Sequence, residues 1–355
     1  MTLPAFVYRA QPNRVVFGAG TLSRLADELR ILGVSRALVL CTPQQIDLAR
    51  STADDLGVLS AGVCPRAAMH TPVGATMLAL DDLRHASADG VVSIGGGSTI
   101  GLGKAISVRT GLPHLAVPTT YAGSEMTPIL GETENGSKTT RRAPEILPVS
   151  TIYDVDLTLG LPAEMSATSG MNAIAHAVEA LYAPDGNPII TLLAEDAIRT
   201  LAGALPTIRE RPADREARHR ALYGAWLAGT CLGSVSMSVH HKICHTLGGA
   251  FDLPHAETHT VMLPHVLAFV AKAVPQATSA IQRALGGGAS APRGLQELAR
   301  ILGAPLSLAE IGMPREGLDP AAEQAVANPY WSPVPLDRAG ARKIIDDAYE
   351  GRRLH

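Results

Sequence analysis

Two pairs of polar residues in the second half of the sequence have the spacing of a shared helical face. Asn172 precedes His176 by four residues, and His241 precedes His245 by four, with His255 soon after. Residues four apart lie on one side of an α-helix, so each pair can direct two polar groups into one cavity. Three histidines and a short polar side chain nearly make a metal site, but an asparagine offers only a neutral carbonyl where a metal favours an aspartate. The pattern indicates the geometry of a metal site without its negative charge.

A glycine cluster in the first half has the position of a phosphate-binding turn. Gly95, Gly96, Gly97 and Ser98 follow an apolar run and precede a helical pattern. The start of a helix presents unpaired N–H groups and a positive dipole end, and glycine lets the backbone approach a ligand closely. We therefore expect this turn to bind a pyrophosphate. A tight strand-to-helix turn without a ligand is the alternative, since glycine serves turns everywhere.

A second polar segment follows the next apolar run. Thr119, Thr120 and Ser124 lie at the expected carboxyl edge of a parallel sheet, where doubly wound sheets bind ligands. Their hydroxyl groups are candidates for contacts with ribose, phosphate or nicotinamide. Tyr121 and Lys138 are candidates for substrate contacts, although each is equally well interpreted as a packing or surface residue.

The elements that must position these residues change character once along the chain. Up to about residue 155 short apolar runs alternate with helical patterns, which predicts a parallel sheet covered on both faces. The expected strands are Arg14 to Phe17, Ala37 to Leu40, Gly90 to Ile94 and Leu115 to Pro118. Amphipathic patterns then follow at 166–181, 189–205, 215–232, 238–247, 261–273, 294–302 and 337–349. We predict a Rossmann-like α/β nucleotide-binding domain over residues 1–157 and an all-α catalytic domain over 158–355.

Composition excludes several classes of protein. The 355 residues carry a formal net charge of -3 and no basic run, so a nucleic-acid partner is not expected. No uninterrupted apolar run approaches the roughly 20 residues of a membrane span, and Met1 leads into proline-bearing sequence. The four cysteines are far apart and show no CxxC spacing, which favours reduced thiols. We therefore expect a cytoplasmic protein without a membrane partner.

Taken together, these motifs resemble the group III, iron-type alcohol dehydrogenase superfamily. The resemblance rests on the glycine turn, Pro118 to Glu125, the helix from Gly170 to Glu179, and the spacing from His241 to His255. It implies a nicotinamide cofactor held between the two domains. The family's metal is held by one aspartate and three histidines, and the matching positions are Asn172, His176, His241 and His255. The aspartate is absent here.

The missing aspartate, the segment after the second strand and the segment Ala67 to Val73 resemble one branch of that family, the maleylacetate reductases. This resemblance implies reduction of a small dicarboxylate, maleylacetate, to 3-oxoadipate in the catabolism of aromatic compounds. It implies NADH or NADPH as cofactor, no metal, and a homodimer. Thr42 stands where many relatives that prefer NAD have an acidic residue for the adenosine ribose. Without that carboxylate a 2'-phosphate is not repelled, so use of both cofactors is expected.

Without a metal, histidines must stabilise the charge that develops on the substrate. His176, His241, His245 and His255 can donate hydrogen bonds near neutral pH, and we expect His245 or His241 to be the proton donor. Three alternatives remain open. The chain could be a metal-dependent alcohol or polyol dehydrogenase that uses Asn172 as a weak ligand, a lyase similar to dehydroquinate synthase, or a dinucleotide-binding protein without activity.

Overall fold

The computed structural model describes residues 5–134 and 137–355, and the chain divides into two compact units. One unit spans Gln11–Leu161. The other contains Pro162–His355 together with the described residues before Gln11. The boundary expected after residue 157 stays a prediction.

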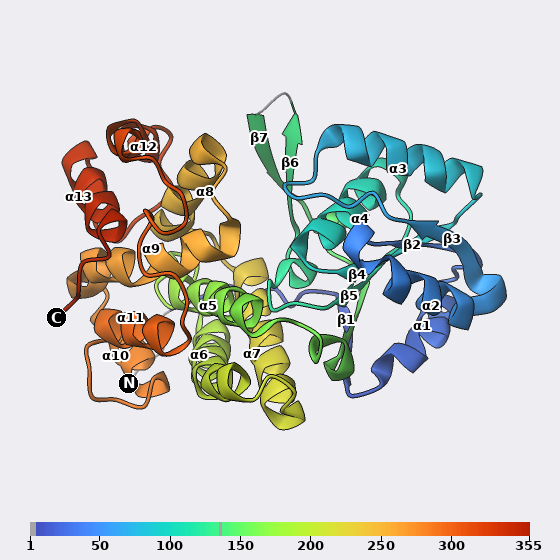
Figure 1. The fold of residues 1–355 in the computed structure, drawn as a ribbon, viewed down its shortest axis with the longest axis horizontal. Helices are drawn as coiled ribbons and strands as arrows, with labels where there is room; N and C mark the ends of the chain where they lie inside the picture. The colour runs from blue at the N-terminus through green and yellow to red at the C-terminus, as the bar shows by residue number, and fades with distance from the viewer. Residues whose placement is uncertain (1–4, 135–136) are drawn as a thin grey trace. The chain divides into compact units, whose positions relative to one another are not determined.

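The first unit is built on a six-stranded parallel sheet with the strand order β1-β8-β5-β4-β2-β3 (Figure 1). Its strands are β1 (Arg14–Gly18), β2 (Ala37–Leu40), β3 (Ser60–Cys64), β4 (Gly90–Gly95), β5 (His114–Pro118) and β8 (Ser150–Asp154). The central strands β2, β4 and β5 are buried along their whole length, as expected for a parallel sheet covered on both faces.

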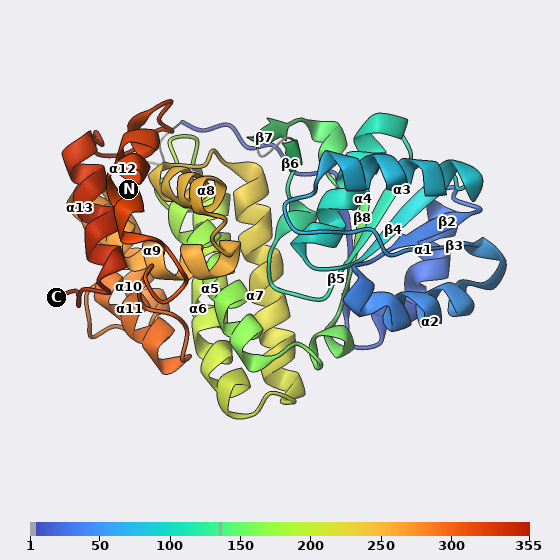
Figure 2. The same cartoon turned by 45° about the horizontal axis from the view of Figure 1, so that its top comes forward.

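Two pairs of helices cover the two faces of this sheet (Figure 2). They are α1 (Leu25–Ile31), α2 (Ile46–Leu56), α3 (Val73–His85) and α4 (Gly97–Thr110). Successive strand residues point to opposite faces, and β2 illustrates the consequence. Val39 packs in the apolar cluster that contains α1 and α2 residues, whereas Leu38 packs in the cluster that contains α3 and α4 residues. The predicted α/β fold is confirmed.

Three strand regions of this unit were not predicted. The sheet strands β3 and β8 and the antiparallel hairpin of β6 (Ile129–Glu134) and β7 (Ser137–Arg142) lack a clear apolar run. β3 consists of Ser-Ala-Gly-Val-Cys, and its small residues give no hydrophobic alternation. β8 is fully buried but contains Ser150, Thr151 and Asp154, so its burial arises from the neighbouring strands and not from its own hydrophobicity.

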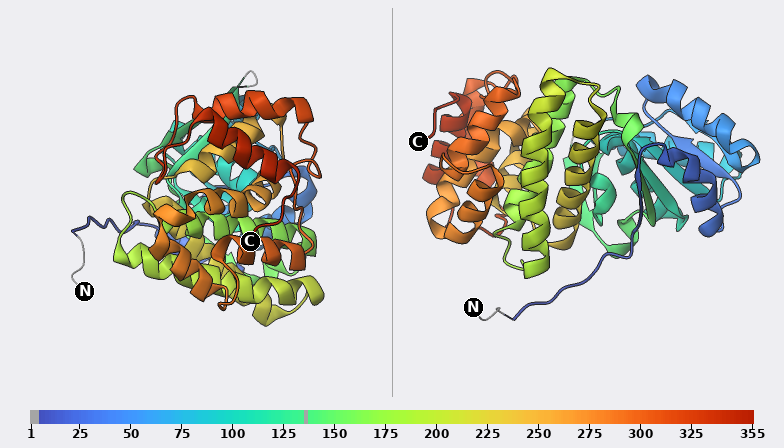
Figure 3. Two further views of the ribbon diagram at one scale, coloured as in Figure 1. Left: turned by 90° about the vertical axis from the view of Figure 1, so that its left-hand side faces the viewer. Right: turned by 90° about the horizontal axis from the view of Figure 1, so that it is seen from below.

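The second unit is all-helical, as predicted (Figures 1 and 3). Its α-helices are α5 (Ala163–Ala180), α6 (Pro188–Glu210), α7 (Arg215–Ser234), α8 (Val239–Phe251), α9 (His255–Val270), α10 (Pro275–Ala284), α11 (Ala291–Ile301), α12 (Leu318–Val326) and α13 (Arg338–Tyr349). Helices α10 and α12 were not predicted, and α9 begins six residues before the expected 261. The early start matters, because it places His255 and His259 in the first two turns of a helix.

The structure also bears on the predictions about membrane-spanning helices and disulfide bonds. Among the described residues, no helix combines the length and the apolar character that crossing a membrane requires. All four cysteines are buried free thiols, which confirms that no disulfide framework joins them.

Candidate active site

The glycine turn has the backbone geometry of an anion-binding turn. Strand β4 ends at Gly95, whose φ is 153°, and a Cβ there would lie 2.4 Å from the Thr99 hydroxyl, so this position requires glycine. The Gly96 carbonyl accepts hydrogen bonds from the N–H groups of Thr99 (3.0 Å) and Ile100 (3.1 Å). Helix α4 begins at Gly97, so the N–H groups of Gly97 and Ser98 belong to its first turn and are not used within the helix. They suit a pyrophosphate oxygen.

The predicted nucleotide-binding residues meet at one edge of the sheet. The chain moves from β2 outward to β3 but from β4 in the other direction to β5, so a topological switch point lies between β2 and β4. Thr42 follows β2, and Gln45, three residues later, donates from its amide to the Thr119 hydroxyl at 2.9 Å. The Thr119 N–H donates to the Gly95 carbonyl at 3.1 Å. Gln45 had no role in our sequence interpretation, although it lies in the segment after β2.

A buried ammonium group anchors the segment that carries Ser124. Lys104 of α4 is fully buried, and its Nζ donates to the Ser124 carbonyl (2.6 Å), the Thr127 hydroxyl (2.9 Å) and the Ile129 carbonyl (2.9 Å). Burial lowers the pKa of Lys104 to about 7, while the neighbouring Glu125 carboxylate opposes that shift. These bonds fix the path of the chain after β5.

Tyr121 and Lys138, the two weaker candidates for substrate contacts, lie in this unit, and their role stays a prediction. Tyr121 is fully buried in the described structure. The Lys138 side chain lies outside the described part of the structure, although its backbone pairs with Thr133 in the hairpin.

The predicted histidines meet in the helical unit. Asn172 and His176 lie on α5, His241 and His245 on α8, and His255 at the start of α9. The ring centroids of His176 and His241 are 5.4 Å apart, those of His241 and His245 5.8 Å, and those of His245 and His255 6.2 Å. The spacing of four within α5 and within α8 therefore places the side chains as expected. We call Asn172, His176, His241, His245, His255 and His259 the histidine cluster.

The cluster has a buried end and an accessible end. Asn172, His176, His241 and His259 are all less than 5% exposed, whereas His245 is half-buried and His255 is exposed. Within the described structure, four polar atoms at the buried end have no hydrogen-bond partner: Asn172 Oδ1, His176 Nδ1, His241 Nε2 and His259 Nε2. Buried polar atoms are nearly always paired, so this group of unpaired atoms indicates a site for a polar ligand.

The Glu179 carboxylate contacts the cluster through His241. Its Oε2 is hydrogen-bonded to His241 Nδ1, and its Oε1 accepts from the N–H groups of His240 (2.8 Å) and His241 (3.3 Å). Burial alone would raise the pKa of Glu179, but the charge and hydrogen bond of His241 lower it below its usual range. A carboxylate at this position holds Nδ1 of His241 as a donor and leaves Nε2 for a ligand. Glu179 follows His176 by three residues, and that spacing predicts a shared helical face.

His259, like Gln45, had no role in our sequence interpretation. It lies one turn after His255 on α9, and its ring centroid is 4.4 Å from that of His255 and 4.9 Å from that of His241. The spacing of four that singled out His241 and His245 applies equally to His255 and His259. The reason it was missed is that the helix was expected to begin at 261.

Burial limits the positive charge that the cluster can hold. Desolvation, followed by repulsion from neighbouring histidines, lowers the pKa of His176 and of His259 well below the usual value. Desolvation also lowers the pKa of His240 to about 3, and the Glu179 charge partly opposes that shift. At neutral pH these three rings are therefore neutral.

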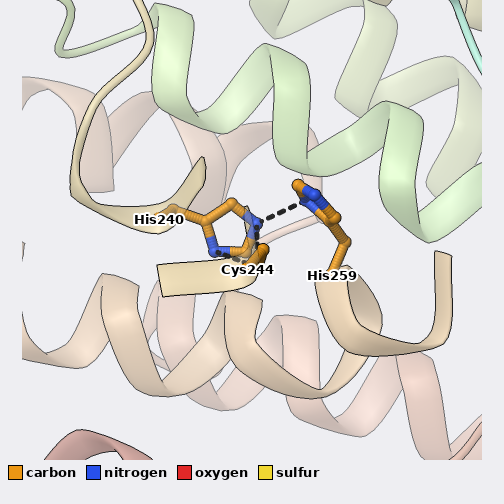
Figure 4. Close-up of side chains that lie close together, drawn as sticks. All are labelled: His240, Cys244 and His259. Carbon is orange, nitrogen blue, oxygen red and sulfur yellow. Dashed lines mark hydrogen bonds between the residues drawn. The ribbon is translucent and has the colours of Figure 1, made fainter. Parts of the chain in front are cut away.

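A candidate metal-binding group adjoins the cluster (Figure 4). His240 and Cys244 of α8 face His259 of α9, with one ligand atom from each lying within 4.8 Å of the others. His240 Nε2 and His259 Nδ1 are hydrogen-bonded at 2.9 Å, and the Cys244 sulfur lies 3.7 Å from His240 Nε2. Burial, followed by the Glu179 charge, raises the pKa of the Cys244 thiol well above its usual value. A metal would therefore have to displace both the imidazole hydrogen bond and the thiol proton.

The ligand positions implied by the iron-type family do not match a metal centre well. His176, His241 and His255 do not form a comparably compact ligand group within the described residues, where the one such trio is His240, Cys244 and His259. The fourth position is Asn172, whose carbonyl is neutral. A dication bound there would have no anionic ligand.

Comparisons with known proteins agree with the fold and show the family. Residues 12–155 match the iron-containing alcohol dehydrogenase family, and residues 166–349 match the C-terminal part of the Fe-containing alcohol dehydrogenase family. The chain is 56% identical over 348 residues to the maleylacetate reductase of Rhizobium sp. (strain MTP-10005), covering 98% of this chain and 99% of that protein.

Solved structures give the same picture. The crystal structure of maleylacetate reductase from Agrobacterium tumefaciens has a TM-score of 0.95 and 56% identity, covering 99% of this chain and 100% of that one. A putative alcohol dehydrogenase from Ralstonia eutropha JMP134 has a TM-score of 0.98 and 54% identity, with coverage of 99% and 100%. The chain belongs to the iron-containing alcohol dehydrogenase family, within its maleylacetate reductase branch, and is an oxidoreductase.

Proposed function

We propose that the chain catalyses the NAD(P)H-dependent reduction of maleylacetate, or a close unsaturated oxo-diacid, to 3-oxoadipate without a bound metal. The likeness to maleylacetate reductases over 98% of the chain supports the substrate. The observation that carries the metal-independent mechanism is the neutral asparagine at 172 among buried nitrogen atoms that lack partners. The glycine turn, with N–H groups at the start of α4, supports a dinucleotide cofactor.

The proposed reaction requires a hydride, a proton and a group that stabilises an enolate. A bound reduced nicotinamide would supply the hydride, to the alkene carbon that is β to the ketone. The electron pair of the double bond then moves onto the ketone oxygen as an enolate, and a proton is added at the α carbon. When both of its ring nitrogens carry a proton, His241 would donate from Nδ1 to Glu179 and from Nε2 to that oxygen. His241 or His245 donates the proton.

A metal-dependent alcohol or polyol dehydrogenase is the second candidate, and the His240, Cys244 and His259 group is the observation in its favour. Metal content separates the two candidates. We expect the purified protein to contain well under one metal per chain after zinc exposure and desalting. We also expect it to oxidise NADH with freshly prepared maleylacetate equally well with and without a chelator. Loss of activity with the chelator, or one tightly held metal, would refute the metal-free mechanism.

The variant Asn172→Asp tests why a metal is not expected. If the cluster keeps the geometry of a metal site and lacks only charge, a carboxylate at 172 should bring zinc binding close to one ion per chain, because carboxylate oxygen is a far better ligand than an amide. Elemental analysis after desalting measures this. A Cys244→Ser variant is the control for the second candidate group, since it removes a thiol without changing residue 172. If Asn172→Asp binds no zinc, the histidines are arranged for substrate carboxylates.

The proposal extends to assembly and location. The resemblance supports a homodimer, which sedimentation of the purified chain would test against a monomer of 37.1 kDa. The cytoplasmic location predicted from the sequence is tested by cell fractionation.

A further inference from the structure

Lys242 is the one lysine or arginine in the sequences of α8 and α9. It precedes His245 by three residues, so the two side chains lie on neighbouring parts of one helical surface. The side chain is half-buried, and no carboxylate lies within 4.0 Å of its Nζ among the residues that the structure describes. A cation with reduced hydration and no anionic partner stands beside the accessible end of the histidine cluster.

Tyr330 connects Lys242 to the cluster. The Lys242 Nζ lies 6.0 Å from the centroid of the Tyr330 ring, within the range of a cation–π contact. The Tyr330 hydroxyl lies 3.5 Å from His245 Nδ1. The loop that carries Tyr330 is fixed at the start of α8, since the Ser238 hydroxyl donates to the Trp331 carbonyl at 2.8 Å. The ammonium group is therefore oriented next to His245 by a residue from a distant part of the sequence.

The arrangement favours an anionic ligand on physical grounds. Partial burial costs an ammonium group hydration, and the aromatic face of Tyr330 restores only part of it. Desolvation accordingly lowers the pKa of Lys242. The Glu179 carboxylate does not form an ion pair with the Lys242 ammonium group, because it is buried against His241 and two backbone N–H groups. An incoming carboxylate would find an unpaired cation and an adjacent imidazole.

We propose that Lys242, oriented by Tyr330, binds one carboxylate of the substrate next to His245 and so selects diacids over monoacids. This inference rests on the proposed function, because it assigns a subsite to the same reaction. It makes Lys242 a specificity residue and Tyr330 a positioning residue.

Kinetics of lysine variants test the inference. Lys242→Gln should raise the KM for maleylacetate about tenfold or more while kcat changes less than about threefold, as expected for an interaction made equally in the ground and transition states. Lys242→Arg should recover most of the loss. Lys272→Gln is the matched control, because Lys272 is exposed in the same unit and has no ion pair in the described structure. An unchanged KM in Lys242→Gln, or an equal rise in Lys272→Gln, would overturn the proposal.

A binding experiment separates this inference from the proposed function. Glutarate, a diacid, should bind the wild-type chain about tenfold more tightly than butyrate, and Lys242→Gln should abolish that difference. Tyr330→Phe keeps the aromatic face and should preserve it, whereas Tyr330→Ala should weaken it. If the wild type fails to reduce maleylacetate but still distinguishes glutarate through Lys242, the substrate assignment is wrong and the subsite stands. If glutarate and butyrate bind equally, the subsite is wrong whatever the activity.

Discussion

The two candidate ligand sites of this chain, the glycine turn and the histidine cluster, are formed by different kinds of groups. The turn at Gly95 to Ser98 depends on backbone N–H groups and on the absence of side chains, and its residues are continuous in sequence. The histidine cluster depends on side chains from three helices, and residues 172 to 259 contribute to it. One site is specified by a local turn and the other by the packing of helices.

This difference decides how each site responds to substitution. A backbone site is insensitive to the identity of most neighbours but does not tolerate a Cβ where the ligand approaches. A side-chain site tolerates changes in volume better than changes in hydrogen-bonding groups, because its buried polar atoms must be paired when the ligand is bound. Substitutions at the two sites should therefore fail for opposite reasons.

The largest effect is expected at the histidine cluster. His241→Phe and His245→Phe keep the bulk of the ring but remove its hydrogen-bonding nitrogens, and at least one of them should lower kcat by roughly a hundredfold or more, the scale of a positioned general acid. The measurement is steady-state NADH oxidation with saturating maleylacetate.

His265→Phe is the matched control for those variants. His265 is a buried histidine of α9 outside the cluster, so its replacement changes a helix that carries cluster residues without removing a cluster donor. We expect its kcat to stay within about threefold of wild type. Near-normal kcat in both His241→Phe and His245→Phe would rule out the proposed proton donors.

The same contrast explains which parts of the molecule were predictable from sequence. The glycine turn was predictable because a strand, three glycines and a helix follow one another. Asn172 with His176, and His241 with His245, were predictable because each pair lies within one helix. The contact of Glu179 with His241 joins α5 to α8, and the contact of Tyr330 with His245 joins α8 to a later loop. No sequence period reports a contact between elements. The polar strand β8 was missed for a related reason, since its neighbours bury it.

The next largest effect is expected at the glycine turn. A Cβ at Gly97 would lie 3.9 Å from the Ala122 Cβ, so the fold has room for Gly97→Ala. The added methyl group would occupy the space where a pyrophosphate approaches α4. We expect the KM for NADH to rise about fiftyfold, the scale of losing a hydrogen bond to a charged group. The control is Gly74→Ala in the first turn of α3, where a Cβ meets nothing within 4 Å. Equal KM values for the two variants would show that the turn is only structural.

A smaller effect concerns stability in acid. His265 is buried, and neither ring nitrogen has a hydrogen-bond partner in the described structure. Burial lowers its pKa to about 4, partly opposed by Asp347. Because the unfolded chain binds this proton near pH 6.5, the neutral ring stabilises the fold above that pH, and the contribution is lost as the pH falls toward 4. Between pH 7 and pH 5, His265→Phe should therefore lose about 2 kcal/mol less stability than wild type in urea unfolding. Parallel losses would show that this ring is not held neutral.

The smallest effect concerns the choice between cofactors at Thr42. Thr42 follows β2 at the edge of the sheet that carries Gly95 and Thr119, and it offers no carboxylate to repel a 2'-phosphate. The catalytic efficiencies with NADH and NADPH should therefore lie within about two orders of magnitude of each other, which is under roughly 3 kcal/mol of discrimination.

Thr42→Asp should lower the efficiency with NADPH about tenfold relative to NADH, since one like-charge contact at a partly exposed site amounts to roughly 1 kcal/mol. Thr42→Asn separates charge from shape, because it has nearly the same size as aspartate without the charge, and it should leave the cofactor ratio close to that of wild type. If the wild type prefers NADH by more than a thousandfold, or if Thr42→Asn shifts the ratio as much as Thr42→Asp, residue 42 does not select the cofactor by its charge.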